Sequence, residues 1–123
     1  MEGTTIESKR ILQTAVEAAD SKHAQDIIAL DVRDISLLAD YFLICSANSE
    51  RQINAIIDEV VEQEEKQGVA IKRIEGKDGA KWVLIDLGDV IVHVFSTSER
   101  EFYNLEKLWS DAPLVDLNAW LVS

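Results

Sequence analysis

The side chains best suited to chemistry are few and scattered along this sequence. The histidines are His23 and His93, and the single cysteine is Cys45. Asp86 and Asp89 are three positions apart across an expected turn, a spacing that is poor for holding paired metal ions on adjacent carboxylates. A lone cysteine forms neither an intramolecular disulfide nor a multi-cysteine zinc site. The sequence therefore predicts no catalytic residue, no metal site and no cofactor.

The spacing motifs of common enzymes are also missing. We find no HExxH or CxxC pattern, no P-loop lysine and no serine in a nucleophile elbow. Asp31, Asp86 and Asp89 together leave metal-dependent phosphoryl or nucleotidyl transfer as an alternative. Cys45 ends an apolar run that starts at Tyr41, so we expect a buried, inert thiol in a reducing compartment.

Length, composition and charge favour one globular domain spanning residues 1–123. A chain of 123 residues with 47% hydrophobic residues buries a core without disulfides or metals. No apolar run approaches the roughly 20 residues that span a bilayer, and the N-terminus lacks a secretory signal pattern. We therefore expect a cytoplasmic protein. The net charge of −11 disfavours nucleic acid and anionic membranes, and it suits a basic protein partner.

Apolar periodicity predicts helices that alternate with strands. Helices are expected at residues 6–20, 49–67 and 98–109, with a further turn of helix at 34–38. Strands are expected at residues 26–32, 40–46, 69–75, 81–87 and 90–95. This order indicates an α/β (α+β) fold in which helices pack on a mixed five-stranded sheet. A tail of residues 110–123 follows.

Local signals set the ends of the second helix. Ser49 and Gln52 fit a capping box, and Gly68 is a natural stop. Ile53, Ile56, Ile57, Val60 and Val61 form its core-facing stripe. Its acidic side is expected to be solvated and consists of Asp58, Glu59, Glu62, Glu64 and Glu65.

The two-residue turn Gly88–Asp89 fixes the register of the last two strands. Because strand side chains alternate between faces, one face is wholly aliphatic and should lie against the helices. That face carries Val83, Ile85, Leu87, Val90, Val92 and Val94. The opposite face, called the mixed face below, carries Trp82, Leu84, Asp86, Ile91, His93 and Phe95. It is either a second core covered by the last helix or the tail, or a partner-binding patch.

Three long blocks carry a family resemblance. Residues 39–52 (ADYFLICSANSERQ), 82–95 (WVLIDLGDVIVHVF) and 100–109 (REFYNLEKLW) resemble the signatures of the ribosomal silencing factor family, also called RsfS or Iojap-like. The resemblance covers about residues 6–109 and leaves out the tail. One departure is Ala47, where the family usually has glycine; alanine does not easily hold a positive φ.

The resemblance implies a nucleotidyltransferase-like topology without that chemistry. It implies binding to the large ribosomal subunit through large-subunit ribosomal protein fourteen, on the surface that faces the small subunit. A factor bound there blocks subunit joining and lowers translation when nutrients are scarce. The resemblance also implies homodimers of the free protein, and a role of organellar relatives in ribosome assembly.

The mixed face lies inside the second signature, so we predict that it contacts the ribosomal protein. Trp82 would be the apolar anchor, and Asp86 and Asp89 would meet basic residues of the partner. The full predicted set is Trp82, Leu84, Asp86, Asp89, His93, Phe95, Glu101 and Tyr103. The alternatives are a ribosome-assembly factor, a residual nucleotide-dependent enzyme, and a general protein-interaction module.

Overall fold

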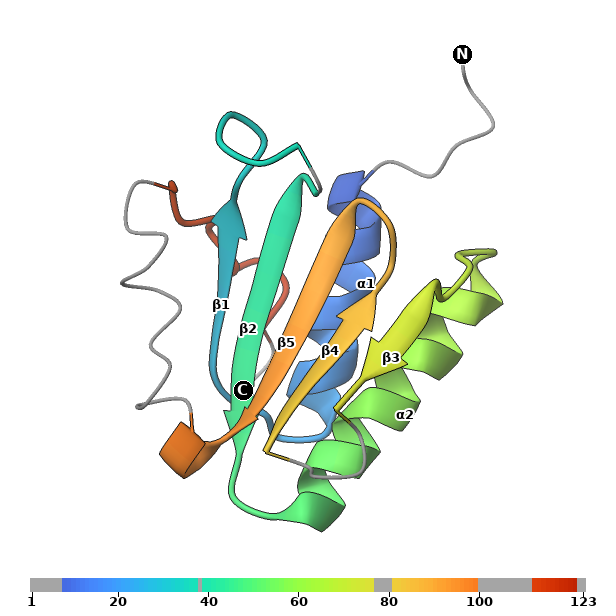
Figure 1. Cartoon of the computed structure of the whole chain (residues 1–123), viewed down its shortest axis with the longest axis vertical. Coiled ribbons are helices and arrows are strands. Elements are labelled where there is room, and N and C mark those ends of the chain that lie inside the picture. Colours follow the sequence, from blue (N-terminus) through green and yellow to red (C-terminus); the bar gives the residue numbers. More distant parts are fainter. Residues whose placement is uncertain (1–7, 38, 77–80, 100–111, 122–123) are drawn as a thin grey trace.

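A mixed five-stranded sheet forms the body of the protein (Figure 1). The computed structural model describes residues 8–37, 39–76, 81–99 and 112–121. The strands are β1 (Gln25–Asp31), β2 (Tyr41–Ala47), β3 (Arg73–Glu75), β4 (Trp82–Asp86) and β5 (Val90–Ser96). They lie in the order β1-β2-β5-β4-β3; β2 and β5 are parallel, and the other neighbours are antiparallel. The predicted class, α/β with a mixed five-stranded sheet, is confirmed.

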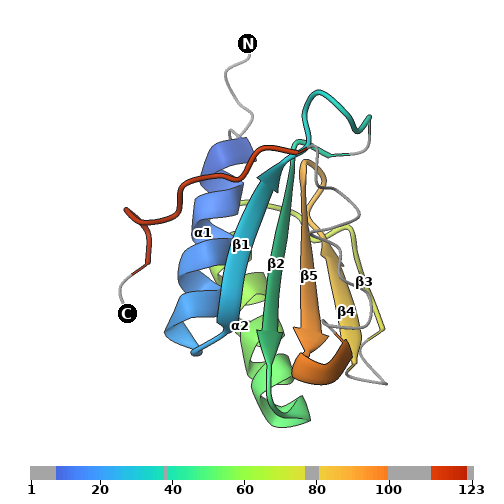
Figure 2. The same cartoon turned by 90° about the vertical axis from the view of Figure 1, so that its left-hand side faces the viewer.

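Two helices, α1 (Ser8–Ser21) and α2 (Glu50–Lys66), cover the same side of this sheet (Figure 2). The aliphatic face of the β4–β5 hairpin packs beneath them, and none of its six side chains is more than 4% exposed. This main core also contains Leu12 and Val16 from α1 and Ile53 and Ile56 from α2. The hairpin parity therefore identified the helix-facing side correctly. Among the described residues, neither helix is long and apolar enough to cross a membrane.

Capping interactions fix both ends of α2. The Ser49 hydroxyl accepts a hydrogen bond from the Gln52 amide (3.1 Å), as the capping box predicts. The Gln52 side-chain oxygen reaches back one residue further than expected and accepts from the amide of Asn48 (3.2 Å). At the other end, Gly68 has a φ of +88°, a conformation that glycine adopts without strain.

The β2 strand is buried along its whole length, so it is a central strand covered on both faces. Ala47 ends this strand and is fully buried. Among the described residues, the non-glycine positions with positive φ are His23 and Asp26. The alanine at position 47 therefore sits in backbone that needs no glycine.

Two expected elements are shorter than predicted. The third strand covers Arg73–Glu75 instead of residues 69–75, because the Val69 amide donates to the Glu64 carbonyl (3.0 Å) and finishes the helix end. Residues 34–38 were expected to form a turn of helix. The structure has a hydrogen-bonded turn there, in which Ile35 and Ser36 both donate to the Val32 carbonyl; Leu38 lies outside the described residues.

The acidic side of α2 is not uniformly solvated as predicted. Glu64 is 0% exposed, since its side chain lies where α1 crosses α2. Gln67 donates both to the Glu64 carboxylate (2.9 Å) and to the Thr14 hydroxyl of α1 (2.6 Å). Glu59 is half-buried, whereas Asp58, Glu62 and Glu65 are exposed.

The last helix begins earlier than its predicted capping box at Ser98. Residues 97–99 are already helical, and the Ser96 hydroxyl accepts from the Glu99 amide (3.3 Å). The predicted continuation over residues 100–109 lies outside the described residues.

The tail after residue 111 adds to the outer edge of the sheet. The Asp31 amide donates to the Pro113 carbonyl (2.8 Å), and the Val115 amide donates to the Ala29 carbonyl (2.9 Å). Leu117 then enters the main core at 6% exposed. The tail therefore covers the free edge of β1 (Figure 2).

Candidate protein-binding face

The β4–β5 hairpin builds the mixed face with the predicted register. Trp82 pairs with Phe95, Leu84 with His93, and Asp86 with Ile91. The turn has a φ of +94° at Gly88, the first turn position, and the Leu87 amide donates to the Val90 carbonyl (2.9 Å). A positive φ at this position is what a type II′ hairpin requires. The turn thus orients every side chain of the face.

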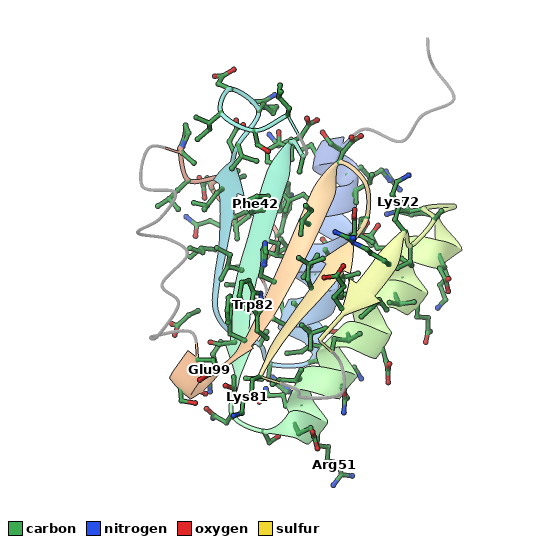
Figure 3. All side chains as sticks on the ribbon, in the orientation of Figure 1. Phe42, Arg51, Lys72, Lys81, Trp82 and Glu99 are labelled. Atoms are coloured by element: carbon green, nitrogen blue, oxygen red, sulfur yellow. The ribbon has the colours of Figure 1, made fainter. Side chains whose placement is uncertain are left out.

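An aromatic cluster forms the centre of the mixed face. The Trp82 and Phe95 rings stack with centroids 5.1 Å apart, and His93 lies 6.0 Å from Trp82 and 6.3 Å from Phe95. Phe42 from β2 meets His93 edge-on at 5.3 Å. Figure 3 shows Trp82 and Phe42 on the side of the sheet turned away from the helices.

Burial divides this cluster into a base and a half-exposed top. Phe95 is 1% exposed, His93 6% and Phe42 8%, whereas Trp82 is half-buried. Leu84, Asp86 and Ile91 are also half-buried. The face therefore combines the two alternatives left open by the sequence: a second small core lies below, and a partly exposed surface lies above it.

His93 holds the indole of Trp82. The Trp82 ring nitrogen donates to His93 Nδ1 (3.2 Å), which places the proton of the neutral imidazole on Nε2. Burial lowers the pKa of His93 to about 4, so the ring is neutral at pH 7. A buried neutral ring of this kind positions its neighbour and is not suited to exchange protons with a substrate near neutral pH.

The two acidic residues of the predicted site are arranged differently. The Asp86 carboxylate accepts from the Gly88 amide (2.9 Å) and lies 3.7 Å from the Arg73 guanidinium, so it partly serves the turn. Asp89 is exposed, and its backbone carbonyl accepts from the amide of Asp40 (2.7 Å). Asp89 therefore offers an exposed negative charge at one end of the mixed face. Glu101 and Tyr103 lie outside the described residues.

The residues considered for catalysis are not brought together. Cys45 is buried within β2, as predicted, and His23 is exposed in the turn after α1. Asp31 forms an ion pair with Arg33 (2.6 Å), which lowers the pKa of that carboxyl. Within the described ranges, no group of three or more histidine, cysteine or acidic side chains is placed to hold a metal ion.

The strands β2 and β1 also contribute to this face, which the sequence patterns did not predict. Phe42 and Ile44 lie beside Ile91 and His93 because β2 pairs with β5 in parallel. The second buried cluster consists of Leu30, Val32, Ala39, Phe42, Ile44, Phe95 and Ala112. The unbroken apolar run of β2 was a signal for it, since a strand buried on both sides must meet a layer on each.

Fold and face together define a small α/β domain with helices on one side of its sheet and an aromatic surface on the other. A family model described as "Ribosomal silencing factor during starvation" matches residues 5–122. A Bacillus subtilis protein named ribosomal silencing factor RsfS is 56% identical over 113 residues, which are 92% of this chain and 96% of that protein. The chain belongs to the ribosomal silencing factor (RsfS) family.

More distant relatives come from organelles. The mouse protein named mitochondrial assembly of ribosomal large subunit protein 1 is 31% identical over 108 residues, 85% of this chain and 47% of that protein.

Among solved structures, one from Bacillus halodurans has a TM-score of 0.79 at 53% identity, covering 89% of this chain and 99% of the other. One from Chromobacterium violaceum has a TM-score of 0.83 at 34% identity, covering 85% and 88%.

Proposed function

We propose that this protein silences translation by binding the large ribosomal subunit through large-subunit ribosomal protein fourteen. The contact is the mixed face, and the bound protein occupies space that the small subunit needs. The mechanism is steric exclusion in the cytoplasm, without catalysis and without a cofactor. Membership of the RsfS family supports the ribosomal role.

The observation that carries the choice of surface is the half-buried indole of Trp82. Phe95 and His93 support it from below, so its orientation is fixed before a partner arrives. Rigid aromatic side chains over a packed base are typical anchors of protein interfaces. Asp89 adds exposed negative charge at one end for a basic partner.

The test is Trp82→Ala. Truncation of a central tryptophan typically costs about 2 kcal/mol or more, which is roughly a thirtyfold loss of affinity. We expect this loss for purified large subunits in cosedimentation, together with a loss of inhibition of subunit joining. Lys81→Ala changes the exposed neighbouring residue of the same chain segment and should leave both readouts unchanged. A folded Trp82→Ala protein with unchanged affinity would exclude Trp82 as the anchor.

A role in assembly of the large subunit is the second candidate. The mouse relative named mitochondrial assembly of ribosomal large subunit protein 1 favours it. The same contact serves both roles, so Trp82→Ala does not separate them. Ribosome profiles of growing and starved cells that lack the protein separate the two roles. Incomplete large subunits during growth indicate a role in assembly, and excess joined ribosomes during starvation indicate silencing.

A further inference from the structure

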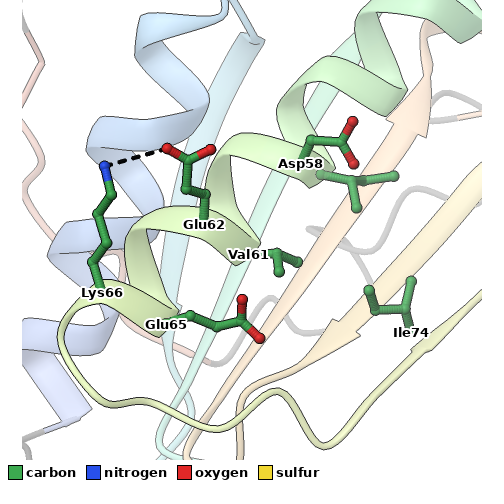
Figure 4. A pocket seen from close by; sticks show the side chains of 7 residues that line it. Asp58, Val61, Glu62, Glu65, Lys66 and Ile74 are labelled. Atoms are coloured by element: carbon green, nitrogen blue, oxygen red, sulfur yellow. Dashed lines mark ion pairs between the residues drawn. The ribbon is translucent and has the colours of Figure 1, made fainter.

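A shallow groove of about 570 Å³ runs between α2 and β3 (Figure 4). Its apolar floor is formed by Ile57 and Val61 from α2 and by Ile74 from β3. Ile57 is 1% exposed, while Val61 and Ile74 are half-buried and pack against the main core. The floor thus presents apolar side chains that are rigidly backed and partly open to solvent.

The rim of the groove is acidic. Asp58, Glu62 and Glu65 are exposed along one side of α2, and the Lys66 ammonium is paired with Glu62 at 3.2 Å (Figure 4). Glu62 and Glu65 against the one ammonium of Lys66 leave this part of the rim negative. Carboxylates three and four positions apart repel one another and destabilise the helix that carries them. A cationic ligand therefore gains both direct attraction and relief of this repulsion.

We propose that this α2–β3 groove binds a basic amphipathic helix of a partner protein. The apolar stripe of that helix would cover Ile57, Val61 and Ile74, and its lysines or arginines would meet the acidic rim. Asp58 to Glu65 spans about 10 Å of α2, which matches two turns of a docked helix. The acidic rim repels the phosphates of RNA, so a protein segment is the occupant that the charge favours.

This inference goes beyond the proposed ribosomal contact because it uses another surface. The groove belongs to the side of the sheet on which α2 packs, whereas Trp82 lies on the opposite side (Figure 3). Both surfaces are therefore accessible at once. A partner in the groove would be recruited while the mixed face is occupied.

The direct test uses the full chain and a synthetic helical peptide of about 14 residues, or four turns, with a leucine stripe flanked by lysines. Binding is measured by fluorescence anisotropy, and the contact is mapped by amide chemical shifts. We expect shifts that gather on residues 57–66 and 73–75. A peptide of the same composition with its stripe scrambled should bind about tenfold more weakly, because it loses the apolar contact.

Two matched double variants distinguish a specific effect of the groove carboxylates from a general effect of net charge on peptide binding. Glu62→Lys with Glu65→Lys should weaken peptide binding about tenfold or more. Glu17→Lys with Asp34→Lys changes the net charge equally at exposed positions elsewhere and should change affinity less than about twofold. Val61→Ser tests the apolar floor with no change of charge and should also weaken binding. Circular dichroism of each variant checks its fold.

Several results would overturn the inference: no binding of the peptide to the wild-type chain, equal effects of both double variants, no effect of Val61→Ser, or shifts that map to the mixed face. Measuring the affinity of each variant for large ribosomal subunits separates failure of the groove proposal from failure of the proposed function. The groove variants should bind large subunits as wild type does, and Trp82→Ala should bind the peptide as wild type does. If a folded groove variant lost binding to large subunits, the groove and the mixed face would not be independent binding surfaces.

Discussion

At the residue scale, Glu64 is a buried carboxyl whose position costs the fold stability. Its carboxyl is buried between α1 and α2, where one oxygen accepts from Gln67 and the other, Oε2, has no hydrogen-bond partner among the described residues. Burial raises the pKa of Glu64 to about 7 from an ordinary value of 4.5, and the Gln67 hydrogen bond opposes this rise. The folded state therefore holds the proton more tightly than the unfolded chain does.

The sign of the resulting pH dependence follows from linkage. Between about pH 4.5 and 7 the folded protein binds more protons at Glu64 than the unfolded chain, so the free energy of unfolding falls as pH rises. Glu64→Gln removes this titration and keeps a polar group of similar size. The variant should gain about 2–3 kcal/mol relative to wild type on going from pH 5 to pH 8. Urea unfolding at several pH values measures it.

Glu65→Gln is the matched control, because Glu65 is the exposed neighbour on the same helix. Its stability relative to wild type should change little over the same pH range. A constant difference between Glu64→Gln and wild type from pH 5 to pH 8 would show that the buried carboxyl does not titrate in this window.

At the scale of elements, the tail and β1 act together. Edge strands expose backbone donors and acceptors, and the tail satisfies those of β1 through the Leu30–Leu114 bridge and its flanking hydrogen bonds. Leu117 anchors the tail in the main core, while Leu114 is 69% exposed. The two leucines therefore have opposite surroundings within one short segment.

This contrast gives a prediction for the tail. Leu117→Ala should lower the free energy of unfolding by about 2–3 kcal/mol, because it removes buried methyl groups and leaves a cavity. Leu114→Ala should change it by less than about 0.5 kcal/mol, since an exposed side chain loses little on truncation. Thermal unfolding of both variants compares them. Equal effects would mean that the tail does not anchor through the core.

At the scale of the whole molecule, the net charge is expected to oppose self-association through the mixed face. We expect the free protein to form a symmetric dimer through the partly exposed mixed face. Each copy carries a charge of −11, so repulsion opposes the dimer at low salt and screening favours it at high salt. Sedimentation velocity should show a dimer fraction that grows with salt and shrinks in Trp82→Ala. If the wild-type protein stayed monomeric at all concentrations and salt levels, the predicted dimer would be ruled out.

The molecule also shows how far sequence patterns reach. The β4–β5 register was predictable because a two-residue turn leaves one pairing, and alternation then assigns every side chain to a face. Glu64 was assigned to the solvated side because it is charged, although it follows Val60 by four positions and helix periodicity therefore places it on the core-facing stripe. The packing of α1 across α2 buries it, and that contact joins residues 53 positions apart, Thr14 and Gln67.

By itself, the sequence determined the order of the five strands along the chain, α1, α2 with its Ser49 cap, and the two faces of the hairpin, since these depend on interactions over a few residues. Tertiary structure alone decided that β2 lies beside β5, which adds Phe42 to the aromatic cluster and buries His93. It also decided that α2 and β3 form a groove. These contacts join distant parts of the chain, where close packing of a shared core selects the partners and local periodicity carries no information about them.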